Sequence, residues 1–351
     1  MKNSMPETRL KSIDILRGYG IVLIVLGHCI AGLLLSKLLG PNPAWARYFL
    51  IFLYLFHMPV IFFVSGFVAR DHKKQAFDFL STLLKWIVAP YVIWTALLVF
   101  IQNITPSAAN NAINPSELLS IFWRPISIFW FLYALFVLKI INYSAIRLFQ
   151  NRLAVSIMLA IIGAGFFGIW EYAGLAMGLL PKIMACLFFY SLGRIAAEKP
   201  ELFEASLKSI EADARRSALV IAICAVGVAV AAWLYANAPA ESINALSEPQ
   251  GWFVVTGSVG ILALLLISRK TAALWFAAWI QQIGLYSMVI YVQHTIWGAG
   301  VRVALTKFNL SNPLLLIAAI VVAGILLSML WQNIADKFGL TKYFGIRPIK
   351  F

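Results

Sequence analysis

Long apolar stretches alternate with short polar segments along almost the whole 351-residue chain. A helix needs about 20 apolar residues to cross the hydrocarbon layer of a membrane. Ten stretches are long enough, and they predict an all-α polytopic bundle of about ten transmembrane helices. They lie near residues 18–39, 47–69, 82–102, 126–143, 153–171, 176–196, 217–236, 252–268, 276–298 and 313–333. The connections are too short to hold a separate core, so we expect a single transmembrane domain over residues 1–351.

The basic residues fall mainly in alternate segments between the spans, beginning with the N-terminal segment. These segments hold 22 of the 28 Lys and Arg residues, and the opposite set holds the other 6. Lys and Arg collect on the cytoplasmic side of short loops. The distribution therefore predicts that both termini are cytoplasmic, in a multi-pass protein of the cytoplasmic (inner) membrane. No small-residue cleavage site follows the first span, so we expect that span to be retained.

Composition excludes several other classes of protein. Hydrophobic residues make up 62% of the chain and charged residues only 12%, whereas about 25% of a soluble domain is charged. A net charge of +14 would suit a nucleic-acid binder only if a soluble fold gathered it on one face. The three cysteines lie inside apolar stretches, where we expect packing residues and no metal site.

Ionisable side chains inside a bilayer are costly, so each one is a hypothesis about function. Arg17 and His28 are eleven residues apart, which places both on one side of a helix, about 16 Å apart along its axis. Asp14 precedes Arg17 by three residues and is expected to pair with its guanidinium. The structural alternatives are an interfacial anchor for Arg17 and a packing residue for His28.

The second span contains a proline and two polar side chains that could line a cavity. Pro59 interrupts the backbone hydrogen bonds, which membrane helices tolerate where neighbours or water satisfy the carbonyl that it frees. His57 lies in the outer half of this span and Ser65 in the inner half. Close helix packing at Ser65 and Gly66 is an equally strong alternative.

Two further clusters lie in the fourth and ninth spans. Trp130 and Tyr133 suit either an interfacial aromatic belt or a platform for the face of a sugar. Ser287, Tyr291 and His294 are spaced four and three residues apart and share a helix face. Such a stripe indicates burial against protein or water, and its spacing is compatible with either a catalytic or a structural role.

In this order along the chain, the clusters resemble the acyltransferase-3 family of integral membrane O-acyltransferases, in its short stand-alone form. The resemblance covers nearly the whole chain. Its first motif is the most specific, and the later motifs gain weight from their order. The matching residues are Asp14, Arg17, Gly18 and His28, then a segment that is similar to Phe-Phe-x-x-Ser-Gly-Phe and ends at Phe67, then Trp130, Phe131 and Leu132, and finally Tyr291 and His294.

The resemblance implies transfer of an acetyl or other short acyl group from cytoplasmic acyl-CoA to a hydroxyl of a cell-envelope polysaccharide or lipid-linked sugar. Acetyl-CoA is then a donor substrate, no cofactor is bound, and the partners are the acceptor and the bilayer, with no nucleic acid. The implied catalytic residues are His28, Arg17 and Asp14. Donor phosphates are assigned to Arg17, Arg70 and Lys85, and the acceptor to His57, Ser65, Trp130, Tyr133, Tyr291 and His294. Family members often carry arginines after the second span, and the lysines found here lose part of that bidentate fork.

The sequence leaves two chemical routes and one other class of function open. A histidine, with an ordinary pKa near 6.5, can take the proton of a sugar hydroxyl, or His28 can itself accept the acyl group and pass it on. A transporter or flippase for a lipid-linked glycan or small anion would also explain buried His and Arg and a broken second span. The chain shows no internal repeat that would favour a transporter.

Overall fold

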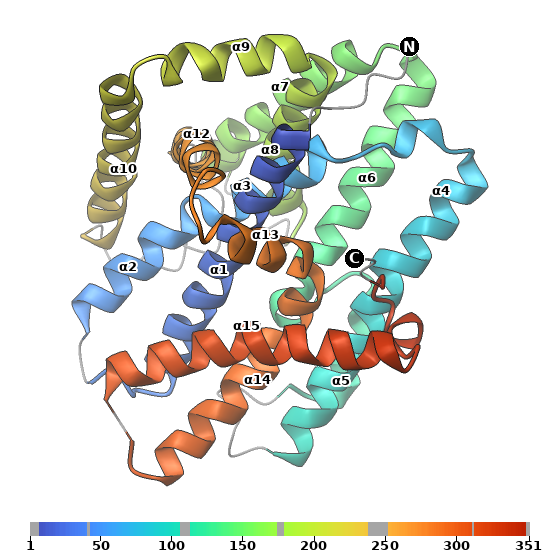
Figure 1. Cartoon of the computed structure of the whole chain (residues 1–351). Coiled ribbons are helices and arrows are strands. Elements are labelled where there is room, and N and C mark those ends of the chain that lie inside the picture. The colour runs from blue at the N-terminus through green and yellow to red at the C-terminus, as the bar shows by residue number, and fades with distance from the viewer. Residues whose placement is uncertain are drawn as a thin grey trace. The chain divides into compact units, whose positions relative to one another are not determined.

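The computed structural model describes residues 7–40, 43–105, 113–173, 179–237, 252–310 and 312–348. Helices form nearly all of this part of the chain, and it contains no strand, so the all-α prediction is confirmed (Figure 1). The chain divides into two compact units. The first comprises Met1–Gly20, Arg47–Lys73 and Leu138–Gly284, and the second Ile21–Ala46, Lys74–Val137 and Leu285–Phe351.

Helix α1 (Glu7–Leu35) is continuous, and its first part belongs to the first unit. There it packs closely against α13 (Ala277–Leu285), because both helices carry a glycine at the contact. A Cβ atom on Gly18 would meet the carbonyl oxygen of Ile280, and one on Gly284 would meet that of Asp14. These glycines let two backbones touch beside Asp14 and Arg17.

The remaining helices of the first unit include α3, which packs against α8 and α12. These remaining helices are α2 (Ala44–Tyr54), α3 (His57–Phe67), the end of α6 (Trp130–Phe149), α7 (Arg152–Ala173), α8 (Leu180–Glu198), α9 (Pro200–Glu211), α10 (Ala214–Ala236) and α12 (Trp252–Thr271). A Cβ on Gly66 would meet the carbonyl oxygen of Tyr190 in α8. The close packing considered for this part of the second span is therefore present at Gly66.

The second predicted span is broken, as Pro59 predicts. Helix α2 ends at Tyr54 and α3 begins at His57, so Pro59 lies in a first turn, where a backbone N–H is not needed. The carbonyl of Leu55, four residues before the proline, accepts a hydrogen bond of 3.4 Å from the hydroxyl of Thr256 in α12. A neighbouring helix thus satisfies the carbonyl that the proline frees.

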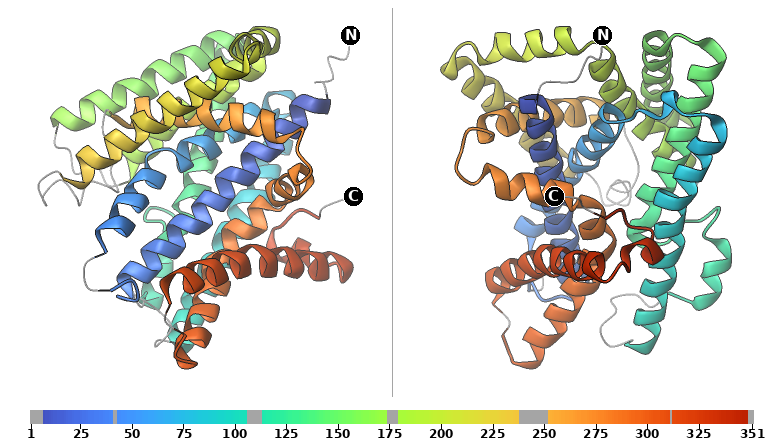
Figure 2. Two further views of the ribbon diagram at one scale, coloured as in Figure 1. Left: turned by 60° about the vertical axis from the view of Figure 1, so that its left-hand side comes forward. Right: turned by 45° about the vertical axis from the view of Figure 1, so that its right-hand side comes forward.

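The second unit contains the rest of α1, the start of α6 and two groups of helices. The first runs through α4 (Ala76–Leu83), a π-helical turn (Leu84–Val88) and α5 (Ala89–Ile104). The second consists of α14 (Ser287–Lys307) and α15 (Pro313–Lys337), which pack side by side (Figure 2). Short turns at Pro115–Ser120, Ser127–Phe129 and Thr341–Phe344 complete this unit.

Seven helical segments of the described chain are long and apolar enough to cross a membrane. They correspond to seven of the ten predicted spans. Of the other three, 153–171 lies in α7, where Arg152–Phe167 forms a shorter apolar helix, and 176–196 begins outside the described residues. The segment 276–298 differs from the prediction, because the chain breaks between α13 and α14 at Tyr286. The total of ten spans and the cytoplasmic termini stay predictions.

Candidate active site

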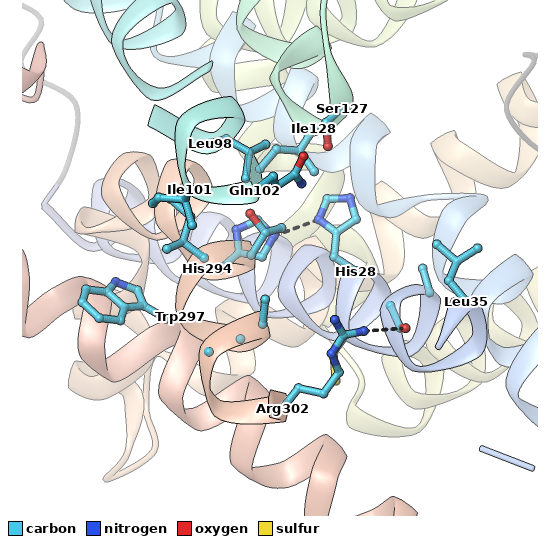
Figure 3. A pocket seen from close by; sticks show the side chains of 18 of the residues that line it. His28, Leu35, Leu98, Ile101, Gln102, Ser127, Ile128, His294, Trp297 and Arg302 are labelled. Carbon is cyan, nitrogen blue, oxygen red and sulfur yellow. Dashed lines mark hydrogen bonds between the residues drawn. The ribbon is translucent and has the colours of Figure 1, made fainter. Parts of the chain in front are cut away.

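A cavity of about 860 Å³ lies within the second unit. Side chains from α1, α5, residues 124–128, α14 and α15 line it, and most of them are apolar. Its polar lining includes His28, Gln102, His294, Thr295 and Arg302, several of which are drawn in Figure 3. A mostly apolar cavity with a few converging polar groups is typical of a binding site for a small molecule.

His28 and His294 are hydrogen-bonded to each other at this cavity (Figure 3). His28 Nδ1 lies 2.8 Å from His294 Nε2, and the two rings are nearly parallel, at 10°. His294 Nδ1 lies 2.9 Å from each of the carbonyl oxygens of Ile290 and Tyr291. A carbonyl can only accept, so Nδ1 of His294 carries a hydrogen.

This arrangement determines where the protons of the two neutral rings lie. Because His294 Nδ1 is protonated, Nε2 of the same ring is an acceptor, and His28 Nδ1 must donate to it. The lone pair of neutral His28 is therefore on Nε2. That nitrogen can take a proton or attack a carbonyl carbon, which are the two actions that acyl transfer asks of a histidine.

Local packing holds His294 in place. Helix α14 starts at Ser287, so the carbonyls of Ile290 and Tyr291 lie one turn before His294 on the same helix. Helix α15 approaches His294 closely, since a Cβ on Gly324 would be 3.3 Å from the Cβ of His294. The His294 side chain is 3% exposed, so it is held on several sides.

Tyr291 supports the wall of the cavity and is absent from its lining. Its hydroxyl donates to the carbonyl of Ile128, and its ring packs edge-on against Phe131. Ile128 belongs to the turn Ser127–Phe129, in which Ser127 has a left-handed φ of 52° and lies on the cavity. A non-glycine residue rarely adopts this conformation, and here the surrounding contacts hold it.

Sequence reasoning missed Arg302 and Gln102. Arg302 is only 8% exposed, lines the cavity, and donates from Nη1 to the carbonyl of Gly32 at 3.3 Å. A charged residue within an apolar helix, eight residues after His294, could have indicated a functional role for Arg302. Gln102 lines the cavity from the last turn of α5, and its sequence context offered no comparable signal.

The predicted pair of Asp14 and Arg17 is present in the first unit. Arg17 Nη1 lies 3.7 Å from Asp14 Oδ1, and the two side chains are 24% and 22% exposed. The side chain of Gln281 in α13 also hydrogen-bonds to Asp14. The pair is thus held by the same α1–α13 contact that Gly18 and Gly284 permit.

The other predicted residues of the first unit have structural partners or lie at its surface. His57 is buried, its Nδ1 donates to the carbonyl of Leu53 at 2.7 Å, and its ring lies 4.9 Å from that of Tyr54. Ser65 is half-buried in α3, and Arg70 is exposed just after this helix. Their roles toward a donor or an acceptor stay predictions.

Besides Tyr291, three predicted residues of the second unit are absent from the lining of the cavity. Lys85 is exposed on the π-helical turn, with its ammonium 4.8 Å from the centre of the Trp86 ring. Trp130 is half-buried at the start of α6, and the ring of Tyr133 lies 6.3 Å from that of Tyr91. Of the residues predicted to bind the acceptor, the structure brings only His294 to the cavity beside His28.

Within the described residues, no group of three or more His, Cys, Asp or Glu side chains could hold a metal ion. A family described as an acyltransferase domain matches residues 10–331. The chain belongs to the acyltransferase-3 family. The matched region contains every acyltransferase-3 motif residue from Asp14 to His294.

One curated relative of this acyltransferase-3 chain is the nodulation protein NolL of Mesorhizobium japonicum. The two are 24% identical over 199 residues, which cover 53% of this chain and 48% of NolL. The match thus spans about half the length of that relative. No solved structure matches the chain.

Proposed function

We propose that this protein is a membrane O-acyltransferase. It moves an acetyl or other short acyl group from cytoplasmic acyl-CoA to a hydroxyl of a cell-envelope polysaccharide or a lipid-linked sugar. The observation that carries this proposal is the His28–His294 pair, which orients a basic nitrogen of His28 at a cavity. Membership of the acyltransferase-3 family supports acyl transfer as the reaction class.

In the proposed reaction, His28 is the general base. Its Nε2 takes the proton of the acceptor hydroxyl while that oxygen attacks the thioester carbonyl carbon. The new C–O bond forms, the C–S bond breaks, and the departing CoA thiolate takes the proton back from His28. His294 favours the charged form of His28, because its Nε2 accepts from His28 Nδ1 while two backbone carbonyls hold its own Nδ1–H.

The proposed donor site uses the cations near the cytoplasmic ends of the spans. Arg17 would bind a CoA phosphate by charge-assisted hydrogen bonds, with Asp14 orienting the guanidinium. Arg70, exposed just after α3, would add charge for the same phosphate, and Lys85 is a further exposed cation proposed for the donor. Helix α1 carries Arg17 and His28 without interruption, about 16 Å apart along its axis, a span that suits a long and thin pantetheine arm.

Transfer can be tested directly on the purified 351-residue protein in lipid nanodiscs. With radiolabelled acetyl-CoA and an envelope extract, we expect a labelled glycan whose label mild alkali releases, as it does from an ester. His28→Ala should lower the rate at least about 100-fold, because general base catalysis contributes about 10²–10⁴-fold. A near-normal rate in a folded, inserted variant would reject the catalytic role of His28. Absence of any labelled product from the unaltered protein, together with movement of a lipid-linked glycan across vesicles, would favour the transporter.

A further inference from the structure

The charged side chains that line the cavity are Arg302, Arg124 and Glu117. Glu117 is occupied at a capping box, where Oε1 accepts the backbone N–H of Asn114 at 3.3 Å. Arg124 is exposed, whereas Arg302 is 8% exposed and belongs to the apolar helix α14. A buried cation in such a helix is costly, and residues of this kind commonly face a substrate pathway.

Two buried polar atoms on the same cavity have no hydrogen-bond partner among the residues that the structure describes. They are Oε1 of Gln102 and Oγ1 of Thr295. Buried polar atoms are nearly always satisfied in folded proteins, so an exception on a cavity wall indicates a missing partner. An amide oxygen can only accept, and it therefore calls for a hydroxyl or N–H group on the bound molecule.

We propose that the cavity binds an acidic sugar as the acceptor, with Arg302 binding a carboxylate or phosphate and Gln102 and Thr295 binding hydroxyls. This inference rests on the proposed function and deepens it by naming the class of acceptor. A guanidinium presents planar paired donors that match both anions, and an apolar surrounding strengthens the contact. Thr295 follows His294, which is hydrogen-bonded to His28, and all three residues line the cavity, so the hydroxyls that Thr295 binds lie near the reacting histidine, His28.

The spacing along α14 places the anionic group away from the acylated hydroxyl. Arg302 follows His294 by eight residues of one continuous helix, which is about 12 Å along the axis. The anion therefore lies away from the acylated hydroxyl, as a carboxylate on a sugar ring or as the phosphate that links the sugar to a lipid. A carboxylate and a phosphate both present anionic oxygens that a guanidinium binds, so Arg302 can bind either group.

Three matched glycosides test this proposal on the protein in nanodiscs without acyl-CoA. They are octyl β-glucoside, octyl β-glucuronide and the phosphodiester of glucose with octanol, which share a chain and ring hydroxyls but differ in charge. We expect at least one anionic compound to bind about tenfold or more tightly than the glucoside, as hydrogen bonds to charged groups predict. The compound with the lower Kd distinguishes a ring carboxylate from a lipid-linked phosphate.

The variants separate the roles of the residues. Arg302→Gln should abolish the preference for the anion while leaving the Kd of octyl glucoside unchanged, which also shows that the cavity is intact. Arg302→Lys should retain part of the preference, and Arg124→Gln, which alters an exposed cation on the same cavity, should retain nearly all of it. Gln102→Leu should weaken all three compounds several-fold, because each offers the same hydroxyls.

Two outcomes would overturn the inference: equal binding of all three compounds, or a preference that survives Arg302→Gln. If Arg302→Gln does not fold, Arg302→Lys and Arg124→Gln still test the proposal. The proposal requires that Arg302→Lys lose more of the preference for the anion than Arg124→Gln does. Because binding is measured without a donor, it is independent of acyl transfer. Transfer to an envelope glycan without any preference for an anion would overturn this inference and leave the proposed function standing.

Discussion

His57 in the first unit and His294 in the second are both buried and make the same kind of hydrogen bond to the backbone. That hydrogen bond has a different role in each unit. His57 Nδ1 donates to the carbonyl of Leu53, and His294 Nδ1 to that of Ile290, in both cases four residues earlier. The side chains are 4% and 3% exposed. In each ring the contact fixes the hydrogen on Nδ1 and leaves the lone pair of the neutral form on Nε2.

The difference lies in the backbone and in the groups that surround each ring. At His57 the chain breaks between α2 and α3, and the ring packs 4.9 Å from Tyr54, so the contact closes a helix end. At His294 the helix is regular, and Nε2 accepts from His28 at a cavity. The same hydrogen bond from Nδ1 thus stabilises a helix break in one unit and orients a second imidazole in the other. The groups around Nε2 decide whether such a histidine has a structural or a chemical role, because the hydrogen bond from Nδ1 is the same in both.

After His28, the largest effect is expected at His294. His294→Phe removes the acceptor of His28 Nδ1–H, so the tautomer of His28 is no longer fixed and the transfer rate should fall about 10–100-fold, within the contribution of general base catalysis. His294→Gln supplies an oxygen that can accept the same hydrogen and should recover much of the rate. Initial rates of acetyl transfer at saturating donor measure both variants. Equal rates for Phe and Gln would contradict the orienting role, because a packing residue would not distinguish them by hydrogen bonding.

At His57 we expect a change in stability and little change in rate. His57→Ala leaves the carbonyl of Leu53 with a poorer partner in a buried place, which should cost about 1–3 kcal/mol of unfolding free energy. His57→Asn, whose amide can donate to the same carbonyl, should recover part of this loss. Thermal denaturation in nanodiscs reports the stability, and kcat and KM of the folded fraction report the activity. A tenfold rise in KM for the acceptor would instead support the acceptor-binding role predicted for His57.

The smallest effect is expected at Asp14. Its ion pair with Arg17 is 3.7 Å long and partly exposed, and pairs of this kind contribute about 0–1 kcal/mol. Asp14→Asn should therefore raise KM for acetyl-CoA only about two- to fivefold, with kcat unchanged. Asp78→Asn, at an exposed acid in the first turn of α4, is the matched control and should change neither constant. A fall in kcat with KM unchanged would place Asp14 in the chemical step.

Several features were predictable because they depend on residues close together in the chain. The apolar runs predicted an all-α membrane protein, and the break near Pro59 followed from its missing N–H. The pairing of Asp14 with Arg17 followed from a spacing of three residues on one helix. The acyltransferase-3 family could also be recognised from the order of short motifs.

Features that join distant segments needed the folded chain. The sequence alone determined that the chain forms long apolar helices and which ionisable side chains they carry, because length, periodicity and i, i+3 spacing are local properties. Only the tertiary structure decided that His294 meets His28 from 266 residues away and that Arg302 and Gln102 share their cavity. The physical reason is that the helices are apolar over most of their surface, so hydrophobicity does not select their partners. Close approach at glycines and a few buried hydrogen bonds make that selection.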